Sequence, residues 1–263
     1  MRKYLRIYKE CLIVAWNQAV AYRLNFVLVS LIMLLGNILF PVFTIMIYRT
    51  GSSYPGWSFF EVLLLQSIFT MADGVSGMVT GGLLWATLHH VQEGSLDTVL
   101  LKPVNTLWFM VTSTMEPTNI GLILGGGILY GISVAKTGGV TLVSFMGSLV
   151  LFLSGVAVLA GISFLMSAMT FKWVGNSRMQ DIFESVKMFG KYPISIFPKS
   201  IQSLLTFCIP VAVVAYFPAR VLLKKGSMGI GKGMFMVIPC FIFMVVCTKI
   251  YNWMVRLYEG VGG

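Results

Sequence analysis

Long apolar runs alternate with short polar segments along this chain, and their lengths predict membrane-spanning helices. A helix rises about 1.5 Å per residue, so roughly 20 apolar residues cross a hydrocarbon core of about 30 Å. Such runs predict spans at about 24–48, 59–88, 106–133 and 234–255. The clearest span lies between Lys136 and Lys172, where no residue is charged. The pattern therefore predicts a helical bundle with at least five crossings.

The first 22 residues follow a different pattern, because charged residues recur among the apolar ones. An apolar face opposite a basic face is typical of a helix that lies along the membrane surface. We therefore predict that residues 1–22 form an interfacial helix. The apolar face consists of Leu5, Tyr8, Leu12, Ala15 and Trp16, and the basic face of Arg2, Arg6 and Lys9.

The stretch 173–225 admits two interpretations. One places a short fifth span at about 179–192, followed by a broken outer segment. The other makes 181–199 a cytoplasmic surface helix and 201–222 the fifth span. Both bring the count to six and put the termini on one side, and basic residues flanking spans mark the cytoplasmic side. Five basic residues predict cytoplasmic termini: Arg2, Lys3, Arg6, Lys9 and Arg23. The same rule favours the second interpretation, which places Lys187, Lys191 and Lys199 inside the cell.

Composition supports the membrane class. Hydrophobic residues make up 57% of the 263 residues and charged residues 11%, whereas a soluble domain carries about 25% charged residues. The net charge of +10 does not indicate nucleic-acid binding, because the basic residues flank apolar runs instead of clustering on a polar surface. The four cysteines and the adjacent His89 and His90 lack metal-site spacing, so we expect no metal site.

Pairs of glycines spaced four apart indicate close helix packing. Small residues at this spacing let helix backbones approach within a membrane, although glycine is also common in membrane helices generally. The pairs are Gly77 and Gly81, Gly121 and Gly125, and Gly127 and Gly131.

Two acids, Asp73 and Glu116, fall within predicted spans. Charged side chains at membrane depth usually face protein or water, so they mark either a substrate or proton path or a structural contact. Glu116 precedes Pro117 in a polar kink, and the two explanations are balanced there. For Asp73 we favour a structural contact.

Catalytic signatures are absent from the sequence. It contains no Gly-x-x-x-x-Gly-Lys-Ser/Thr phosphate loop, no His-Glu-x-x-His pair and no Gly-x-Ser-x-Gly elbow. We therefore expect no catalytic, cofactor-binding or metal residues in this chain. Any uphill transport would draw its energy from a partner or from an ion gradient.

The polar stretch 89–105 between the second and third spans contains the most informative motif. Its sequence from Glu93 is EGSLDTVLLKPVN. A glycine, an acid, a short amphipathic turn and a proline predict a compact intracellular elbow, in which Leu96, Leu100 and Leu101 share an apolar face and Asp97 and Lys102 point outward. The simpler alternative is an ordinary loop before a helix that begins at Pro103.

This motif, Gly94-x-Leu96-Asp97-x-x-Leu100-Leu101-Lys102-Pro103-Val104-Asn105, resembles the signature of type-2 ABC exporter permeases. It is most similar to the six-span permeases usually encoded in pairs beside one ATPase. A second match is the proline-punctuated stretch before the last span: Tyr192-Pro193-Ile194-Ser195-Ile196-Phe197-Pro198, Ile209-Pro210-Val211-Ala212 and Tyr216-Phe217-Pro218-Ala219. The resemblance covers nearly the whole chain, 1–263, as one permease domain.

The resemblance implies roles for three segments. Residues 1–22 would be a connecting helix, 93–103 would couple to an ATPase subunit, and 192–223 would form short re-entrant gate helices near the outer surface. The implied coupling residues are Glu93, Gly94, Leu96, Asp97, Leu100, Lys102 and Pro103. The implied path or gate residues are Glu116, Tyr192, Pro193, Phe197, Pro198, Pro210 and Pro218. This arrangement favours the first interpretation of the fifth span, because prolines suit a broken segment better than a straight one.

The resemblance further implies a permease subunit of an ATP-driven exporter in the cell membrane. Its partners would be an ABC ATPase, which binds ATP and Mg, a second permease chain and membrane lipid. The alternative is a secondary transporter or channel in which Asp73 and Glu116 relay protons, although we find no internal repeat typical of such folds. A membrane-embedded enzyme and a structural assembly protein are further alternatives. The substrate class stays open among drugs, peptides, lipids and glycans.

Overall fold

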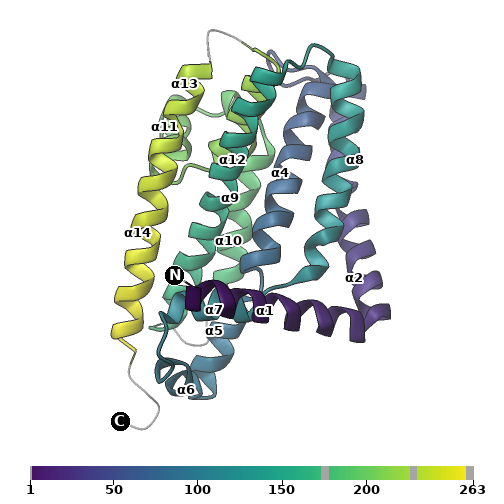
Figure 1. The fold of residues 1–263 in the computed structure, drawn as a ribbon. Coiled ribbons are helices and arrows are strands. Elements are labelled where there is room, and N and C mark those ends of the chain that lie inside the picture. Colours follow the sequence, from purple (N-terminus) through teal and green to yellow (C-terminus); the bar gives the residue numbers. More distant parts are fainter. Residues whose placement is uncertain (1, 173–177, 226–229, 259–263) are drawn as a thin grey trace.

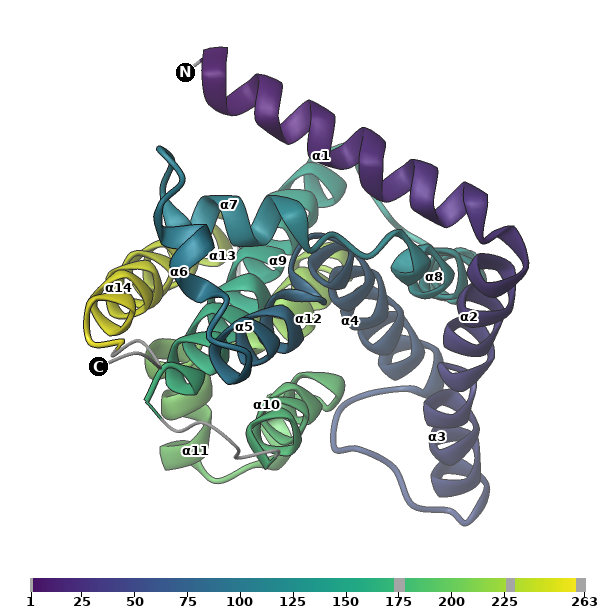
Figure 2. The same cartoon turned by 90° about the horizontal axis from the view of Figure 1, so that it is seen from below.

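The structure, a computed structural model, describes residues 2–172, 178–225 and 230–258. Within these ranges the secondary structure is helical without strands, so the predicted all-α class is confirmed. Long helices run along a common axis, and α1 (Arg2–Ala21) lies across one end of the bundle, as expected for an interfacial helix (Figures 1 and 2). Residues 1, 173–177, 226–229 and 259–263 of the predicted permease domain lie outside the described residues.

Within the described ranges, five segments are long and apolar enough to cross a membrane, and a bent pair of helices brings the number to as many as six. The segments are Arg23–Arg49, Phe59–Gln92, Pro117–Thr137, Leu142–Thr170 and Gly233–Arg256. Their helices are α2 (Arg23–Gly36), α3 (Leu39–Arg49), α4 (Phe59–Thr80), α5 (Leu83–Gln92), η1 (Pro117–Asn119), α8 (Ile120–Thr137), α9 (Leu142–Thr170), α13 (Ile230–Phe235) and α14 (Val237–Arg256). Short helices α6 (Leu96–Leu100) and α7 (Thr106–Ser113) link the second and third segments at the end where α1 lies (Figure 1).

The third crossing begins at Pro117, so the prediction that it starts at 106 is wrong. Asn105 caps α7 by accepting a hydrogen bond from the Trp108 backbone N–H at 3.1 Å. The helix then ends at Ser113, and α7 packs against α1 across the bundle axis (Figure 2). The helix does not continue from α7 into the third crossing because the stretch up to Pro117 is polar and ends in a proline. Proline has no backbone N–H to donate the hydrogen bond that would continue the helix.

The stretch between α9 and α13 is broken into short pieces, as the first interpretation predicts for its outer segment. Its short span at about 179–192 is not among the described segments that are long and apolar enough to cross a membrane. The pieces are α10 (Arg178–Met188), η2 (Phe189–Lys191), η3 (Ile194–Ile196), α11 (Lys199–Ser203), the π-helical turn η4 (Leu204–Cys208) and α12 (Ala212–Leu222). Lys199–Cys208 and Ala212–Leu222 meet at 102°. A straight 201–222 span and a continuous 181–199 helix, which the second interpretation requires, are therefore both wrong.

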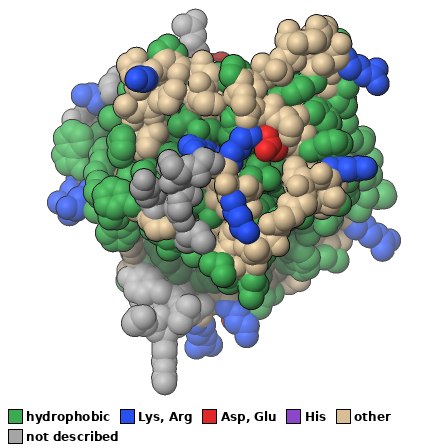
Figure 3. All heavy atoms as spheres, turned by 90° about the horizontal axis from the view of Figure 1, so that it is seen from above, with side chains coloured by type: hydrophobic (Ala, Val, Ile, Leu, Met, Phe, Trp, Pro, Cys, Tyr) green, Lys and Arg blue, Asp and Glu red, His purple; other side chains and the backbone are tan. Residues whose placement is uncertain are grey.

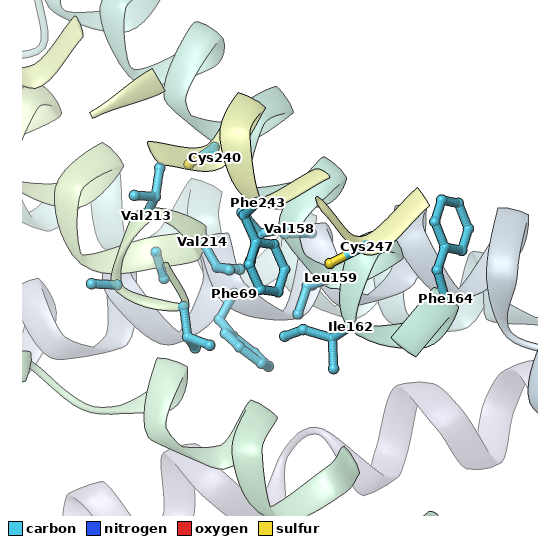
Figure 4. Packing of buried hydrophobic residues seen from close by; sticks show 14 of the residues in the cluster. Phe69, Val158, Leu159, Ile162, Phe164, Val213, Val214, Cys240, Phe243 and Cys247 are labelled. Atoms are coloured by element: carbon cyan, nitrogen blue, oxygen red, sulfur yellow. The ribbon is translucent and has the colours of Figure 1, made fainter. Parts of the chain in front are cut away.

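The centre of the bundle is α9, which packs against α4, α12 and α14. Figure 4 shows Val158, Leu159 and Ile162 of α9 lying between Phe243 and Cys247 of α14 on one side and Phe69 of α4 on another. Cys247 and Cys240 are buried, as expected of cysteine acting as a small hydrophobic residue. This packing fixes the position of α4, which carries the polar residues described below.

The three glycine pairs differ in what they contact. A Cβ atom at Gly121 would lie 2.0 Å from the Ser30 carbonyl oxygen of α2, and Gly125 also faces α2, through Leu34. This pair confirms the prediction of close helix packing. Gly77 and Gly81 face polar side chains, and Gly127 and Gly131 have open space around them, so neither pair joins two helix backbones.

Gly121→Ala should therefore destabilise the protein. The added methyl group forces the backbones of α2 and α8 apart, and overpacking of this kind costs about 1–3 kcal/mol. The matched control is Gly127→Ala on the same helix, which meets nothing within 4 Å and should be neutral or slightly stabilising, because alanine favours helix. Thermal unfolding in detergent measures both. Equal unfolding temperatures for the two variants would contradict the contact.

Candidate functional site

The elbow after α5 is a compact turn at the end of the bundle where α1 lies (Figure 1). Gly94 has φ +65°, a left-handed conformation that glycine adopts readily and other residues adopt at a cost. This turn lets α6 fold back, so that Leu96 and Val99 are buried. The elbow is therefore anchored by its own apolar residues.

The apolar face of the elbow differs from the predicted one. Leu96 and Val99 face the bundle, whereas Leu101 is 85% exposed and Leu100 is 39% exposed. Residues three or four apart share a helix face, so Leu100 lies at the edge of the buried face, whereas Leu101 follows the last residue of α6 and is rotated away from it. Asp97 is exposed as predicted, and it therefore shares the outer surface with two leucines.

Polar side chains of the elbow make local contacts. His89 and His90 lie in the last turn of α5. His89 Nε2 lies 3.1 Å from Glu93 Oε2, and His90 Nδ1 lies 2.8 Å from Ser95 Oγ. Lys102 is exposed beside Pro103, and its ammonium lies 3.8 Å from the centroid of the Phe109 ring. These contacts hold the two ends of the elbow against α5 and α7.

A cavity of about 580 Å³ lies between α2, α4, α5, η1, α8, α9, α10 and η2. Charged or hydrogen-bonding side chains line it from α4, η1 and the residue before it, α9, α10 and η2, and from Asn37, which follows α2. They include Asn37, Asp73, Ser76, Thr80, Glu116, Asn119, Ser163, Glu184, Lys187 and Lys191. Because a membrane interior excludes such groups unless they face protein or water, the cavity is the candidate substrate path within this chain.

Asp73 forms an ion pair that the sequence pattern did not reveal. Lys187 Nζ lies 2.9 Å from Asp73 Oδ1 and 2.9 Å from Glu184 Oε1. Lys187 is buried at 7% exposure. Lys191 lies nearby, 4.6 Å from the centroid of the Phe40 ring. The structural contact expected of Asp73 is thus present, and it joins α4 to α10 at the wall of the cavity.

Glu116 lies at the break before the third crossing, as its position before a proline predicted. Its backbone N–H donates to the Met78 carbonyl at 3.0 Å, and Asn119 Nδ2 donates to Glu116 Oε2 at 3.3 Å. A Cβ atom at Gly81 would lie 2.7 Å from Glu116 Oε2, and one at Gly82 would lie 2.6 Å from the Thr114 carbonyl oxygen. The two glycines at the bend between α4 and α5 therefore make room for this segment.

The predicted gate residues lie apart from Glu116, since none of them lines the cavity. Tyr192 packs edge-on against Phe40 and Tyr54, with ring centroids 5.7 and 6.3 Å apart. Phe197 packs against Phe189 at 5.6 Å. Pro193 and Pro210 are buried, and Pro198 is exposed. Pro218 lies inside α12, which continues past it, so the expected break at Pro218 is wrong. The role of this segment as a gate stays a prediction.

A second ion pair joins α4 to the segment after α12. Lys225 pairs with Glu61, and its ammonium lies 4.7 Å from the centroid of the Trp57 ring. Arg220 donates to the Lys225 carbonyl at 3.1 Å. This cluster lies at the end of the bundle opposite α6, the end seen in Figure 3, where basic side chains lie among hydrophobic ones. No sequence spacing indicated the partner of Glu61, which lies 164 residues away.

The chain was compared with known proteins. The model of a family described as "ABC-2 family transporter protein" matches residues 31–262, which is most of the chain. No curated protein and no solved structure matches.

Proposed function

The chain belongs to the ABC-2 transporter family, and on this premise we propose that it is the permease subunit of an ATP-driven exporter. Membership in the family makes it a multi-pass membrane transport subunit, and such permeases generally work with an ATPase subunit. In this proposal ATP and Mg bind to the partner. Two permease chains, identical or related, enclose the path for the substrate.

The observation that carries the proposal is the exposed surface of the elbow. Leu101 and Leu100 project from a rigid turn that is anchored by buried Leu96 and Val99. An exposed apolar group beside the acid Asp97 has the character of a protein contact, because exposed apolar surface rimmed by polar residues marks sites of interaction. The elbow is therefore the proposed docking site for the ATPase.

We place the elbow in the cytoplasm, together with α1 and the end of α14. Support comes from the basic residues of the N-terminal region, because Lys and Arg accumulate on the cytoplasmic side of short membrane segments. Four of them are on α1 and the fifth begins α2, at the end of the bundle where the elbow lies. The protein then resides in the cell membrane with cytoplasmic termini.

A mechanical route leads from the elbow to the path. The elbow follows α5 directly, and α5 continues into α4 across the bend at Gly81 and Gly82. Through Asp73 and Glu61, α4 holds both α10 and the segment after α12. ATP-driven closure of the partner would displace α5, and α4 would carry that movement to the cavity and to the broken fifth crossing. Such rigid-body shifts between two states are an established type of switch.

Affinity purification in mild detergent tests the partner. The tagged wild-type chain should bring down an ATP-binding subunit, and Leu101→Asp should lose it, because a charge replaces the apolar contact. The control is Leu142→Asp, a 75% exposed position at the start of α9, where an acid is tolerated near the helix N-terminus. Recovery of no ATP-binding subunit with the wild type would contradict the proposal. Transport in vesicles that lack the ATPase, driven by a proton gradient, would favour the secondary-transporter alternative.

A further inference from the structure

The charges that line the cavity do not balance. Asp73, Glu184, Lys187 and Lys191 form a group of two acids and two lysines on α4, α10 and η2. Their formal charges cancel. Glu116 is the fifth charged residue of the lining, and it leaves the described wall of the cavity with one negative charge in excess.

Glu116 lies away from the four-residue group. Its Oε2 atom approaches Gly81, which follows Asp73 by eight positions on the same helical path, or about 12 Å at 1.5 Å per residue. Among the described residues Glu116 forms no ion pair, and its side chain receives a hydrogen bond from Asn119. Lys187 pairs with both acids of the group, and the Lys191 ammonium lies over the rings of Phe40 and Phe69.

Apolar side chains surround this part of the cavity. Trp85 is 52% exposed and lines the cavity one turn after Gly81. Aromatic and apolar walls favour the apolar part of a ligand, and an aromatic ring also attracts a cation placed over its face. The other apolar lining residues are Ile32, Met33, Leu84, Leu122 and Met166.

We propose that the cavity binds an amphipathic organic cation, whose positive charge pairs with Glu116 and whose apolar body packs against Trp85 and its neighbours. The proposal rests on the proposed function and names its substrate class. A positive ligand restores charge balance at a depth where a lone carboxylate is unfavourable. An anion would be repelled by the uncompensated carboxylate of Glu116. A ligand without apolar surface would leave the hydrophobic wall exposed.

Two ions of nearly equal shape and opposite charge test this assignment. Tetraphenylphosphonium and tetraphenylborate are dialysed against the full chain in detergent, with protein-free micelles subtracted. Wild type should bind tetraphenylphosphonium saturably. Glu116→Gln, which keeps the size of the side chain and one oxygen that can accept from Asn119, should weaken that binding about tenfold, as expected for the loss of one charge contact. Glu116→Asp should retain most of it. Tetraphenylborate binding should not fall in Glu116→Gln.

The matched control is Glu10→Gln, an exposed glutamate on α1 outside the cavity, which should leave both ions unaffected. Thermal unfolding of each variant verifies that the bundle is intact. Saturable binding that is equal in wild type and Glu116→Gln would overturn the proposal, as would the absence of saturable tetraphenylphosphonium binding. The assay needs no ATPase. If the chain recruits the ATPase but does not bind the cation, only this inference is therefore refuted. If the chain binds the cation but recruits no ATPase, the exporter assignment is refuted.

Discussion

Combining Gly94→Ala with Asp97→Lys should leave ATP hydrolysis running while the cavity stops responding to ATP. Alanine at φ +65° is strained, by about 1 kcal/mol or more for a residue with a Cβ atom, so the elbow shifts. The lysine reverses the charge presented beside Leu100 and Leu101. Both changes act where force is proposed to enter the permease, and neither touches the nucleotide site of the partner.

The response of the cavity is measured by maleimide labelling of Trp85→Cys in a background without the native cysteines, in vesicles that contain the ATPase. ATP should change the labelling rate severalfold with the intact elbow and leave it unchanged with the altered one. Gly51→Ala is the control for strain, because Gly51 has φ +80° with open space around it and lies in the loop after α3. An altered elbow that still transmits the ATP-dependent change would remove the coupling role.

Lys187→Met should be the most destabilising single substitution considered for this protein. It leaves the Asp73 and Glu184 carboxylates without the ammonium that they share at 2.9 Å. Removing one partner of a buried ion pair costs roughly 3–5 kcal/mol. We expect about 3 kcal/mol here, the lower end of that range, because Asp73 lines the cavity and the Glu184 side chain is 53% exposed.

Adding Asp73→Asn to Lys187→Met should recover much of that loss, because the uncompensated charge disappears. Lys199→Met is the control, since Lys199 is an exposed lysine at the start of α11 and should behave as wild type. Thermal unfolding of the four proteins in detergent reports the comparison. A Lys187→Met protein as stable as Lys199→Met would show that the pair does not hold α10 against α4.

The apolar runs predicted the bundle because helix length and hydrophobicity are local properties of a sequence. Periodicity could not reveal that α7 turns across the axis, since the run from 106 to 133 is apolar almost throughout and only the polar kink at Glu116 divides it. Prolines correctly marked 192–210 as broken. At Pro218 the same signal was misleading, because a helix tolerates a proline when its surroundings satisfy the freed carbonyl group.

The candidate site was predictable only in part. Glu116 and Asp73 were identified because acids are rare within membrane helices. Their surroundings were not, since Lys187 is 114 residues from Asp73 in sequence and the rule for basic residues assigned it to a cytoplasmic surface. The exposed leucines of the elbow were misassigned because a five-residue helix has too few positions to define its buried face from sequence.

Labelling of Leu101→Cys by a membrane-impermeant maleimide tests the central claim most directly. In a chain without its native cysteines, this 85% exposed position should react only from the cytoplasmic side, and binding of the ATPase subunit should protect it. Leu142→Cys, at the opposite end of the bundle, should react only from the outside and stay unprotected. Reaction of Leu101→Cys from the outside, or equal reaction with and without the ATPase, would contradict the account.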